Sequence, residues 1–397
     1  MCGILFTCSL SHLAGPPQHT SQLGQILQKL RAENSARGPD AQDSCNFDVD
    51  GSELSFFSSE LHLRGNEHIS QPHRNDNGHV LCWNGEILIT ENDGLKLFDL
   101  LRTTRSAEEF RDVLATIEGP YAIVYYHPIL RRIFFARDPL GRRSLLIHLP
   151  NASNPSIILT SVSFGSHSLV APEELSTDCI HFLDVDRLRT VTTPDAFVAS
   201  MGRISRVAEG NISPFAESRK VNTSIPDNPP KTADLDNIPM HLLSSVDGLI
   251  AQLDRSVMLQ TYNIPQSSDK GKARVAVLFS GGIDSTVLAF LAHRYVEPEE
   301  PIDLLNVAFE NPRKILVKAE GNIGGLPKRE KKAKLKDRLD YSTVNIQYDV
   351  PDRLTGRQEV TQVEIDVPYD ESQAARPRVE ALMFPGRTIM DLLRVLQ

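Results

Sequence analysis

Hydrophobic positions in the first 160 residues follow a helical period at the start of the chain and then, mostly, the two-residue period of strands. Apolar residues at helical spacing predict a helix over 21–34, and turn residues end it at 37–40. Strands are predicted at 54–63, 80–83, 87–89, 121–126, 132–136, 144–148 and 157–160. Two more helices are expected, at 95–101 and after Ser106, which has capping-box spacing with Glu109. The pattern predicts an α+β block with mainly antiparallel strands.

A different order of elements follows residue 241. Helical spacing predicts a helix over 242–258, and 274–279 is a continuous apolar segment, typical of a buried parallel strand. Residues 280–285 turn the chain into a helix that extends to Tyr295, and 302–309 supplies the next strand. This order predicts a strand–helix–strand unit with parallel strands. Between the two blocks, 209–241 is rich in Pro, Ser, Asn and Asp, which predicts a linker or long surface segment.

Charge and composition narrow the class of protein. The 397 residues include 42 Lys and Arg against 51 Asp and Glu, a formal charge of −9. This balance argues against nucleic acid or an anionic membrane as the main partner, and we interpret a basic stretch at 313–338 as a solvated insertion. No apolar segment approaches the roughly 18 residues of a membrane-spanning helix, and the first residues lack the basic start of a signal peptide. Five cysteines without paired spacing give no disulfide or zinc framework, so we expect a cytoplasmic protein.

Cys2 is the first residue that suggests chemistry. Removal of Met1 would leave a thiol and a free α-amino group on one residue, and an amine with a pKa of about 7.7–8.0 can accept the thiol proton near neutral pH. The alternative is a small buried thiol near the start of a strand, which position alone favours.

Five motifs in a fixed order favour the interpretation of Cys2 as a nucleophile over that of a buried thiol. They are Cys2-Gly3-Ile4, Arg37-Gly38-Pro39-Asp40, Trp83-Asn84-Gly85-Glu86-Ile87, Asn92-Asp93 and Arg137-Asp138-Pro139-Leu140-Gly141-Arg142-Arg143. Over about the first 185 residues the set resembles the class II glutamine amidotransferases. The resemblance implies an amino-terminal-nucleophile (αββα) fold and a glutaminase in which the Cys2 thiolate attacks the γ-amide of glutamine.

The same resemblance assigns roles to other residues. Asn84 and Gly85 would donate hydrogen bonds to the tetrahedral oxyanion, Asp93 would hold the α-amino group of glutamine, and Glu86 would also contact the substrate. Taken alone, Asn84-Gly85 favours a tight hairpin turn, and Asp93 favours a helix cap before Leu95.

The chain departs from the family pattern at several positions. Ala36 stands where the family usually has His, and Leu88 where it usually has Tyr. Glu60-Leu61 occupies the place of the arginine that binds the glutamine carboxylate, so Arg64 is the nearest candidate for that role. A carboxylate without its bidentate arginine loses a charge-assisted pair. These departures support the alternative of a catalytically weak or inactive regulatory or binding protein that retains the amidotransferase fold.

A second motif, Ser280-Gly281-Gly282-Ile283-Asp284-Ser285, follows a predicted strand and begins a helix. In that position glycines let backbone N–H groups approach a phosphate at the helix amino terminus. The alternative is a glycine-rich turn without a ligand. The motif lacks the lysine of a Walker loop and resembles the pyrophosphate loop of ATP pyrophosphatases, whose domain is α/β, adenine nucleotide α-hydrolase-like, with a parallel sheet.

This second resemblance implies ATP and magnesium as cofactors. Ser280, Gly281, Gly282 and Ser285 would hold the pyrophosphate, with Asp284 acting through the metal. Leu278 and Val307 would line the adenine pocket, although ordinary core packing explains both residues equally.

The two sites in this order resemble the asparagine synthetase domain-containing protein family, whose versions of 61–65, 141–146, 300–309 and 350–357 this chain shares. The resemblance implies a glutamine-dependent asparagine synthetase-like enzyme acting on glutamine, aspartate and ATP. We expect an amidotransferase domain at 2–185, a linker or long surface segment at 186–241 and a partial synthetase domain at 242–397. The family continues beyond the counterpart of 388–392, so we expect an incomplete second domain with a doubtful synthetase step. A protein partner or homodimer stays open.

Overall fold

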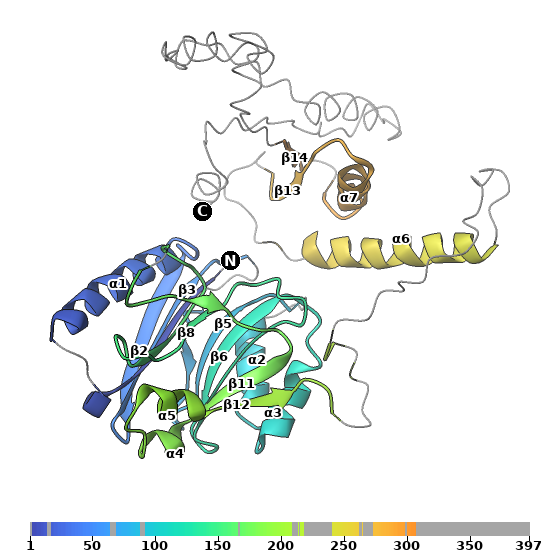
Figure 1. Cartoon of the computed structure of the whole chain (residues 1–397). Coiled ribbons are helices and arrows are strands. Elements are labelled where there is room, and N and C mark those ends of the chain that lie inside the picture. The colour runs from blue at the N-terminus through green and yellow to red at the C-terminus, as the bar shows by residue number, and fades with distance from the viewer. Residues whose placement is uncertain are drawn as a thin grey trace, which may run out of the picture. The chain divides into compact units, whose positions relative to one another are not determined.

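A computed structural model describes residues 2–13, 17–63, 69–87, 92–165, 167–208, 213, 215–217, 240–261, 264, 273–297 and 300–306. The chain divides into two compact units, Met1–Lys231 and Thr232–Gln397, and each is described by itself (Figure 1). No helix in this part of the chain is long and apolar enough to cross a membrane.

The first unit contains two six-stranded sheets in which all neighbouring strands are antiparallel. The first sheet has the order β10 (Glu173–Glu174), β8 (Leu146–His148), β9 (Ser156–Thr160), β1 (Gly3–Leu10), β3 (Ser52–Glu60), β2 (Ala41–Val49). The second has the order β12 (Met201–Ser205), β11 (Cys179–Asp184), β7 (Arg132–Arg137), β6 (Tyr121–His127), β5 (Val80–Gly85), β4 (His73–Arg74).

Alternation along the strands places these sheets face to face. Ile4, Phe6 and Cys8 of β1 share one buried cluster with Val80 and Cys82 of β5, and the same cluster includes residues of β3, β6, β7, β9 and β11. Because successive side chains point to opposite faces, the other positions of these strands face outward. The main hydrophobic core therefore lies between the sheets.

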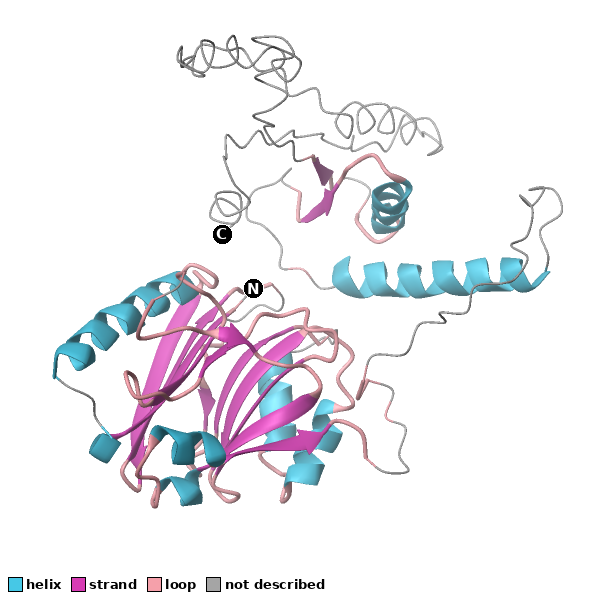
Figure 2. Cartoon of the chain, viewed as in Figure 1, coloured by secondary structure: helices cyan, strands magenta, loops and turns pink. Residues whose placement is uncertain are grey.

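Helices cover both outer faces of the pair. Ile26 and Leu30 of α1 (Pro17–Ser35) pack against Leu5 and Phe57 of the first sheet. On the second sheet, Trp83 and Tyr125 join a cluster with residues of α2 (Asp93–Leu101) and α3 (Ala107–Leu114). Figure 2 shows the strands of this unit gathered between helices. The result is a four-layer α–β–β–α arrangement, so the predicted α+β class with antiparallel pairing is confirmed for the first unit.

Several predicted elements are found with shifted bounds, and others were not predicted. The helix expected at 21–34 is α1, and Ser106 caps α3 as expected by accepting a hydrogen bond from Glu109 N–H at 3.1 Å. β2 and β12 were not predicted. Ile87 lies in a loop rather than a strand, and residues 88 and 89 lie outside the described part of the chain.

The segment 186–241, expected to be a linker or long surface segment, begins with ordered structure. It contains most of α4 (Val185–Leu188), then α5 (Pro194–Ala199) and β12, which pairs with β11. Arg206 follows β12 and donates hydrogen bonds to Arg137 O and to Tyr121 Oη. The first unit therefore continues past residue 185, to at least residue 206, because these residues complete its second sheet.

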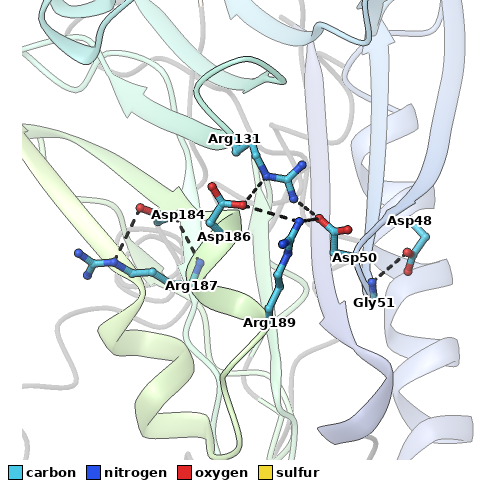
Figure 3. A network of polar contacts seen from close by, with 8 residues as sticks. All are labelled: Asp48, Asp50, Gly51, Arg131, Asp184, Asp186, Arg187 and Arg189. Atoms are coloured by element: carbon cyan, nitrogen blue, oxygen red, sulfur yellow. Dashed lines mark hydrogen bonds and ion pairs between the residues drawn. The ribbon is translucent and has the colours of Figure 1, made fainter.

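A network of charged residues joins turns of both sheets to α4 (Figure 3). Asp50, in the turn between β2 and β3, pairs with Arg131, in the turn between β6 and β7, and with Arg189 at 2.6 Å. Arg131 also donates to Asp186 of α4 at 2.5 Å. Gly3 pairs with Ser59 and Leu10 with Ser52, so the β2–β3 turn lies at the end of the sheet far from Cys2.

The second unit contains α6 (Met240–Thr261), β13 (Val275–Leu278), α7 (Ile283–His293) and β14 (Ile302–Leu305). β13 and β14 are parallel, so the predicted strand–helix–strand unit is found. Val257 of α6 joins Phe279, Leu291 and Leu304 in a small buried cluster. The strands predicted at 341–350 and 360–367 lie outside the described residues.

Candidate active site

A pocket lies where β1 begins and where β3 and β5 end, one end of the two-sheet core. It encloses about 550 Å³ including its open mouth. Its lining includes Cys2, Leu61, Gly85, Glu86, Ile87 and Asp93. Four of the predicted site residues, Cys2, Gly85, Glu86 and Asp93, are therefore brought together although 91 positions separate the first from the last.

Cys2 directly precedes β1, and its neighbour fixes where the strand starts. A Cβ on Gly3 would lie 2.3 Å from Asn34 O, so only glycine fits this close approach. Cys2 N–H donates to Asn84 Oδ1 at 3.1 Å, and Arg37 Nε donates to Cys2 O at 3.2 Å. The residue is thus held by both sheets, through β1 and β5.

The surroundings of Cys2 keep its thiol protonated. Burial raises the pKa of the Cys2 thiol above its ordinary value, the Leu61 backbone N–H opposes this effect, and the carboxyls of Glu60 and Asp93 add to it. The thiolate is the nucleophile, so this residue needs a base that takes its proton during attack.

Asn84 is 1% exposed and lies at the penultimate position of β5. Its Oδ1 accepts from Cys2 N–H, while its Nδ2 has no hydrogen-bond partner. A buried amide nitrogen without a partner is costly, and here it lies on the side chain that contacts Cys2. Asn84 and Gly85 pair with Ala122 and Tyr121 inside the sheet, so the hairpin turn favoured by the Asn-Gly dipeptide is wrong.

Asp93 is the first residue of α2, and its carboxylate accepts three hydrogen bonds. Trp83 Nε1 and Ile87 N–H donate to Oδ2 at 3.1 and 2.8 Å, and Gly94 N–H donates to Oδ1 at 2.8 Å. The helix cap is Asn92, whose Oδ1 accepts from Leu95 N–H at 2.9 Å. The alternative of a helix cap at Asp93 is therefore wrong, and the residue lines the pocket.

Glu86 and Arg64 are the other two residues that the sequence predicts to bind the substrate. Glu86 lines the pocket and lies 3.8 Å from Arg143 Nη2. Arg64, the candidate for the glutamine carboxylate, lies outside the described residues, as does Leu88. The sequence did not identify Trp83 or Gln71 as site residues, although both line the pocket and Gln71 Oε1 accepts from Trp83 N–H at 2.8 Å. The chain's only tryptophan beside Asn84-Gly85 was the available signal.

The second motif forms the connection from β13 to α7. Gly281 has φ +80°, a left-handed conformation that favours glycine. Gly282 caps α7 without a side-chain hydrogen bond, so the first N–H groups of the helix have no capping side chain. Ser285 Oγ donates to Gly282 O at 2.9 Å and lies 3.4 Å from Ser280 Oγ.

The other residues assigned to this second site are placed differently. Asp284 is exposed in the first turn of α7. Leu278 is 69% exposed at the end of β13, and Val307 lies outside the described residues. Among the residues that the structure describes, no cluster of three or more His, Cys, Asp or Glu side chains is arranged to hold a metal ion.

No family model matches. A Gallus gallus protein named asparagine synthetase domain-containing protein 1 is 29% identical, covering 98% of this chain and 73% of its own length. The Homo sapiens protein of the same name is 28% identical, with coverages of 98% and 71%. A Saccharomyces cerevisiae asparagine synthetase domain-containing protein is 28% identical, with coverages of 92% and 62%.

A solved structure of glutamine phosphoribosylpyrophosphate amidotransferase from B. subtilis, complexed with ADP and GMP, matches 84% of this chain and 70% of that one. It is 14% identical with a TM-score of 0.35, a level that identifies no fold. The sequence relatives match the family that the motifs resemble. The chain is therefore a relative of the asparagine synthetase domain-containing proteins.

Proposed function

We propose that the first unit is an amino-terminal-nucleophile glutaminase in which Cys2 hydrolyses the side-chain amide of glutamine. The observation that carries this proposal is the contact between Cys2, which lines the pocket, and Asn84, whose buried Nδ2 has no hydrogen-bond partner. We further propose that the released ammonia serves an ATP-dependent amidation of aspartate to asparagine in the second unit.

The geometry of Cys2 supports a mechanism without a separate catalytic base. Removal of Met1 turns the Cys2 nitrogen, which already bonds to Asn84 Oδ1, into a free α-amine. This amine takes the thiol proton as sulfur attacks the amide carbon, since an α-amine titrates near neutral pH. The new C–S bond places a negative charge on the former carbonyl oxygen, and Asn84 Nδ2 donates to it.

Breakdown of this intermediate completes the cycle. The α-ammonium group returns its proton to the leaving nitrogen, the C–N bond breaks and ammonia departs, which leaves a γ-glutamyl thioester on Cys2. Water, activated by the same amine, then attacks the thioester, so that glutamate is released and the thiol is restored.

The charges of the pocket favour an amino acid with a free ammonium group. Glu60, Glu86 and Asp93 contribute carboxyls to the lining. Because Glu60 and Asp93 raise the pKa of the Cys2 thiol, a bound ammonium group beside Asp93 would offset part of that effect. Substrate binding would thereby make thiolate formation easier.

The connection from β13 to α7 supports the ATP-dependent part of the proposal. The residues fit an anion, because Gly281 has positive φ, Gly282 has no Cβ and the α7 amino terminus has no capping side chain. Bound Mg·ATP would supply adenylation of a carboxylate there. Ser280, Gly281, Gly282 and Ser285 would hold its pyrophosphate, and Asp284 would contribute one oxygen ligand to magnesium.

The experiment is ammonia release from L-glutamine by the full chain, with Met1 removal verified by mass spectrometry. We expect Cys2→Ala to abolish release. Cys45→Ala, which removes a half-buried thiol of β2, should leave it unchanged and serves as the matched control. Equal rates for the wild type and Cys2→Ala would contradict the glutaminase proposal and favour a binding role.

A second assay tests the amidation step separately. With aspartate, Mg·ATP and ammonium chloride, we expect AMP and asparagine to form slowly and in equal amounts. Asp284→Ala should reduce this formation without changing ammonia release from glutamine. AMP formation that is equal in the wild type and Asp284→Ala would refute the assignment of this residue.

A further inference from the structure

The indole of Trp83 lines the pocket but takes no part in the proposed glutaminase steps. This side chain is 1% exposed and belongs to the cluster between the second sheet and its helices. Its ring stacks on Tyr121 with centroids 5.6 Å apart and planes 19° apart. Its backbone N–H donates to Gln71 Oε1. The indole is thus held on several sides and has little freedom to rotate.

The indole N–H is a donor and cannot accept, and its partner is Asp93 Oδ2 at 3.1 Å. α2 begins against this ring, since a Cβ on Gly94 would lie 3.3 Å from Trp83 Cδ1. A buried indole N–H needs a partner, so the bond holds the first turn of α2 to β5 as well as the carboxylate itself.

The three hydrogen bonds to Asp93 are divided unequally between its two carboxylate oxygens. Oδ2 accepts from Trp83 and Ile87, whereas Oδ1 accepts from Gly94 alone. A carboxylate offers about four lone-pair sites, so one acceptor position on Oδ1 is left for a ligand in the pocket. Rotation of the carboxylate about its Cβ–Cγ bond would move Oδ2 away from both of its donors, and the rigid indole opposes that rotation.

We propose that Trp83 is a positioning residue, whose indole N–H fixes the Asp93 carboxylate in the orientation that receives the α-ammonium group of glutamine. This inference rests on the glutaminase proposal for its substrate, but the contact between the two side chains can be tested without turnover.

The hydrogen bond from Trp83 to Asp93 can be detected through the pKa of the Asp93 carboxyl group. Burial raises the pKa of Asp93, the N–H groups of Ile87, Trp83 and Gly94 lower it, and the Glu86 carboxyl raises it. Removing the indole donor therefore moves the Asp93 titration to higher pH. Three other titratable groups, Cys2, Glu60 and His62, line the same pocket, so the measurement must observe Asp93 itself.

The test uses the full chain in which tryptophan is replaced by benzothienylalanine, whose ring has sulfur in place of the N–H. Because Trp83 is the only tryptophan, global replacement changes this position alone and keeps the shape of the ring. Tyr121→Phe is the matched control, since it retains the stacked ring and removes only the hydroxyl bonded to Arg206.

The first readout is the Asp93 carboxyl carbon followed by NMR across the pH range, assigned by its loss in Asp93→Asn. We expect its midpoint to lie at higher pH in the benzothienylalanine chain and to be unchanged in Tyr121→Phe. Coincident midpoints in the wild type and the benzothienylalanine chain would overturn the proposal.

The second readout is glutaminase kinetics. We expect KM for glutamine to rise about tenfold and kcat to change less than about twofold, because a charge-assisted contact to the substrate is weakened. The acid limb of kcat/KM should move to higher pH with the NMR midpoint. A loss confined to kcat would contradict a positioning role. If the wild-type chain releases no ammonia, the glutaminase proposal fails, while the NMR titration still decides whether Trp83 controls Asp93.

Discussion

At the scale of single residues, the most informative side chain is that of Asn84, because only one end of its amide group forms a hydrogen bond. Its Oδ1 holds the Cys2 nitrogen, while Nδ2 is buried without a partner. Natural proteins rarely leave a buried amide donor unpaired. A ligand oxygen would satisfy it, which is why we assign it to the oxyanion.

Asn84→Asp tests this assignment with little change in volume. The variant keeps an acceptor for the Cys2 nitrogen and replaces the donor with an oxygen that repels the oxyanion. We expect kcat for ammonia release to fall about 100- to 1000-fold, the typical cost of losing one such donor. Alkylation of Cys2 by iodoacetamide should continue, which shows that the nucleophile is intact. A kcat within tenfold of the wild type would refute the oxyanion role of Asn84.

A substitution at Gly85, the last residue of β5, tests how tightly this end of the strand is packed. A Cβ there would lie 2.3 Å from Trp83 Cζ2, and that ring is buried. We expect Gly85→Ala to lower the free energy of unfolding of the first unit by about 1–3 kcal/mol, as overpacking does. Urea unfolding followed by the fluorescence of Trp83, the only tryptophan, measures this value.

Gly24→Ala is the matched control for Gly85→Ala. Gly24 lies within α1, and a Cβ added there would meet no neighbouring atom within 4 Å. Alanine at this position should raise the free energy of unfolding by about 0.5–1 kcal/mol, because glycine weakens a helix interior. Destabilisation by both variants to the same extent would show that the close approach at Gly85 is not responsible.

At the scale of elements, the hairpin between β2 and β3 shows what sequence patterns can predict. Asp50 and Gly51 both have positive φ, 56° and 85°, as a tight two-residue hairpin turn requires. The Asp-Gly pair and the alternating Cys45, Phe47 and Val49 before it were signals for β2 that the prediction did not use. The Asn84-Gly85 pair favours a turn by the same local rule, and there the sheet keeps the strand extended.

Other differences between prediction and structure have tertiary causes. β12 alternates little between buried and exposed positions and is specified by pairing with β11, which no local pattern reveals. The Asp93 carboxylate accepts a hydrogen bond from Trp83, ten positions earlier, a contact that no local pattern predicts. By contrast, strands with strong apolar patterns, such as β6, and the helix cap at Ser106 were predicted correctly because their signals are local.

Asp50 also offers a test of the charged network in Figure 3. Hydrogen bonding to Arg189 is the main cause that lowers the pKa of Asp50, and Arg131 adds to it. We expect Asp50→Asn to lower Tm of the first unit by up to about 3 °C at low ionic strength. At 1 M NaCl the difference should shrink, since screening there acts within about 3 Å. A salt-independent difference would assign the effect to the turn and not to the charges.

Asp99→Asn is the control for this network. Asp99 forms an exposed pair with Arg102 three residues along α2, and an isolated surface pair contributes little. We expect no measurable change in Tm. Equal effects of the two variants would show that the network contributes no more than a single pair.

At the scale of the whole molecule, the sequence predicted the order of helices and strands better than the way they pack together. Local patterns indicated an antiparallel α+β block and a later strand–helix–strand unit, and both are found. The four layers were expected only from the resemblance to a known family, because residue spacing does not tell which sheet packs on which. The pocket follows from that packing, since Cys2 directly precedes a strand of the first sheet and Asn84 lies in a strand of the second.

Buried histidines make the stability of the first unit depend on pH. His73 is 5% exposed, its Nε2 has no hydrogen-bond partner, and burial lowers its pKa to about 4. The unfolded chain binds a proton near pH 6.5. The contribution of neutral His73 is therefore complete above about pH 6.5 and is lost as the pH falls toward 4.

His73→Leu tests this dependence. We expect the loss in free energy of unfolding between pH 7 and pH 4 to be about 3 kcal/mol smaller in the variant. Chemical denaturation followed by Trp83 fluorescence at several pH values measures the slope. An unchanged slope would show that His73 is not responsible and would favour His79, whose pKa burial also lowers to about 4.

The central position of β1 in its sheet has a consequence for biosynthesis. β1 lies between β3 and β9, so the strand that follows Cys2 gains its second neighbour only after residue 160 has left the ribosome. At common elongation rates the interval is on the order of ten seconds. We expect the amino terminus to be accessible during that time to the enzymes that remove Met1, before Cys2 and the donor proposed for the oxyanion are fixed side by side. Ribosomes carrying incomplete chains should therefore expose a processed amino terminus before the glutaminase site is complete.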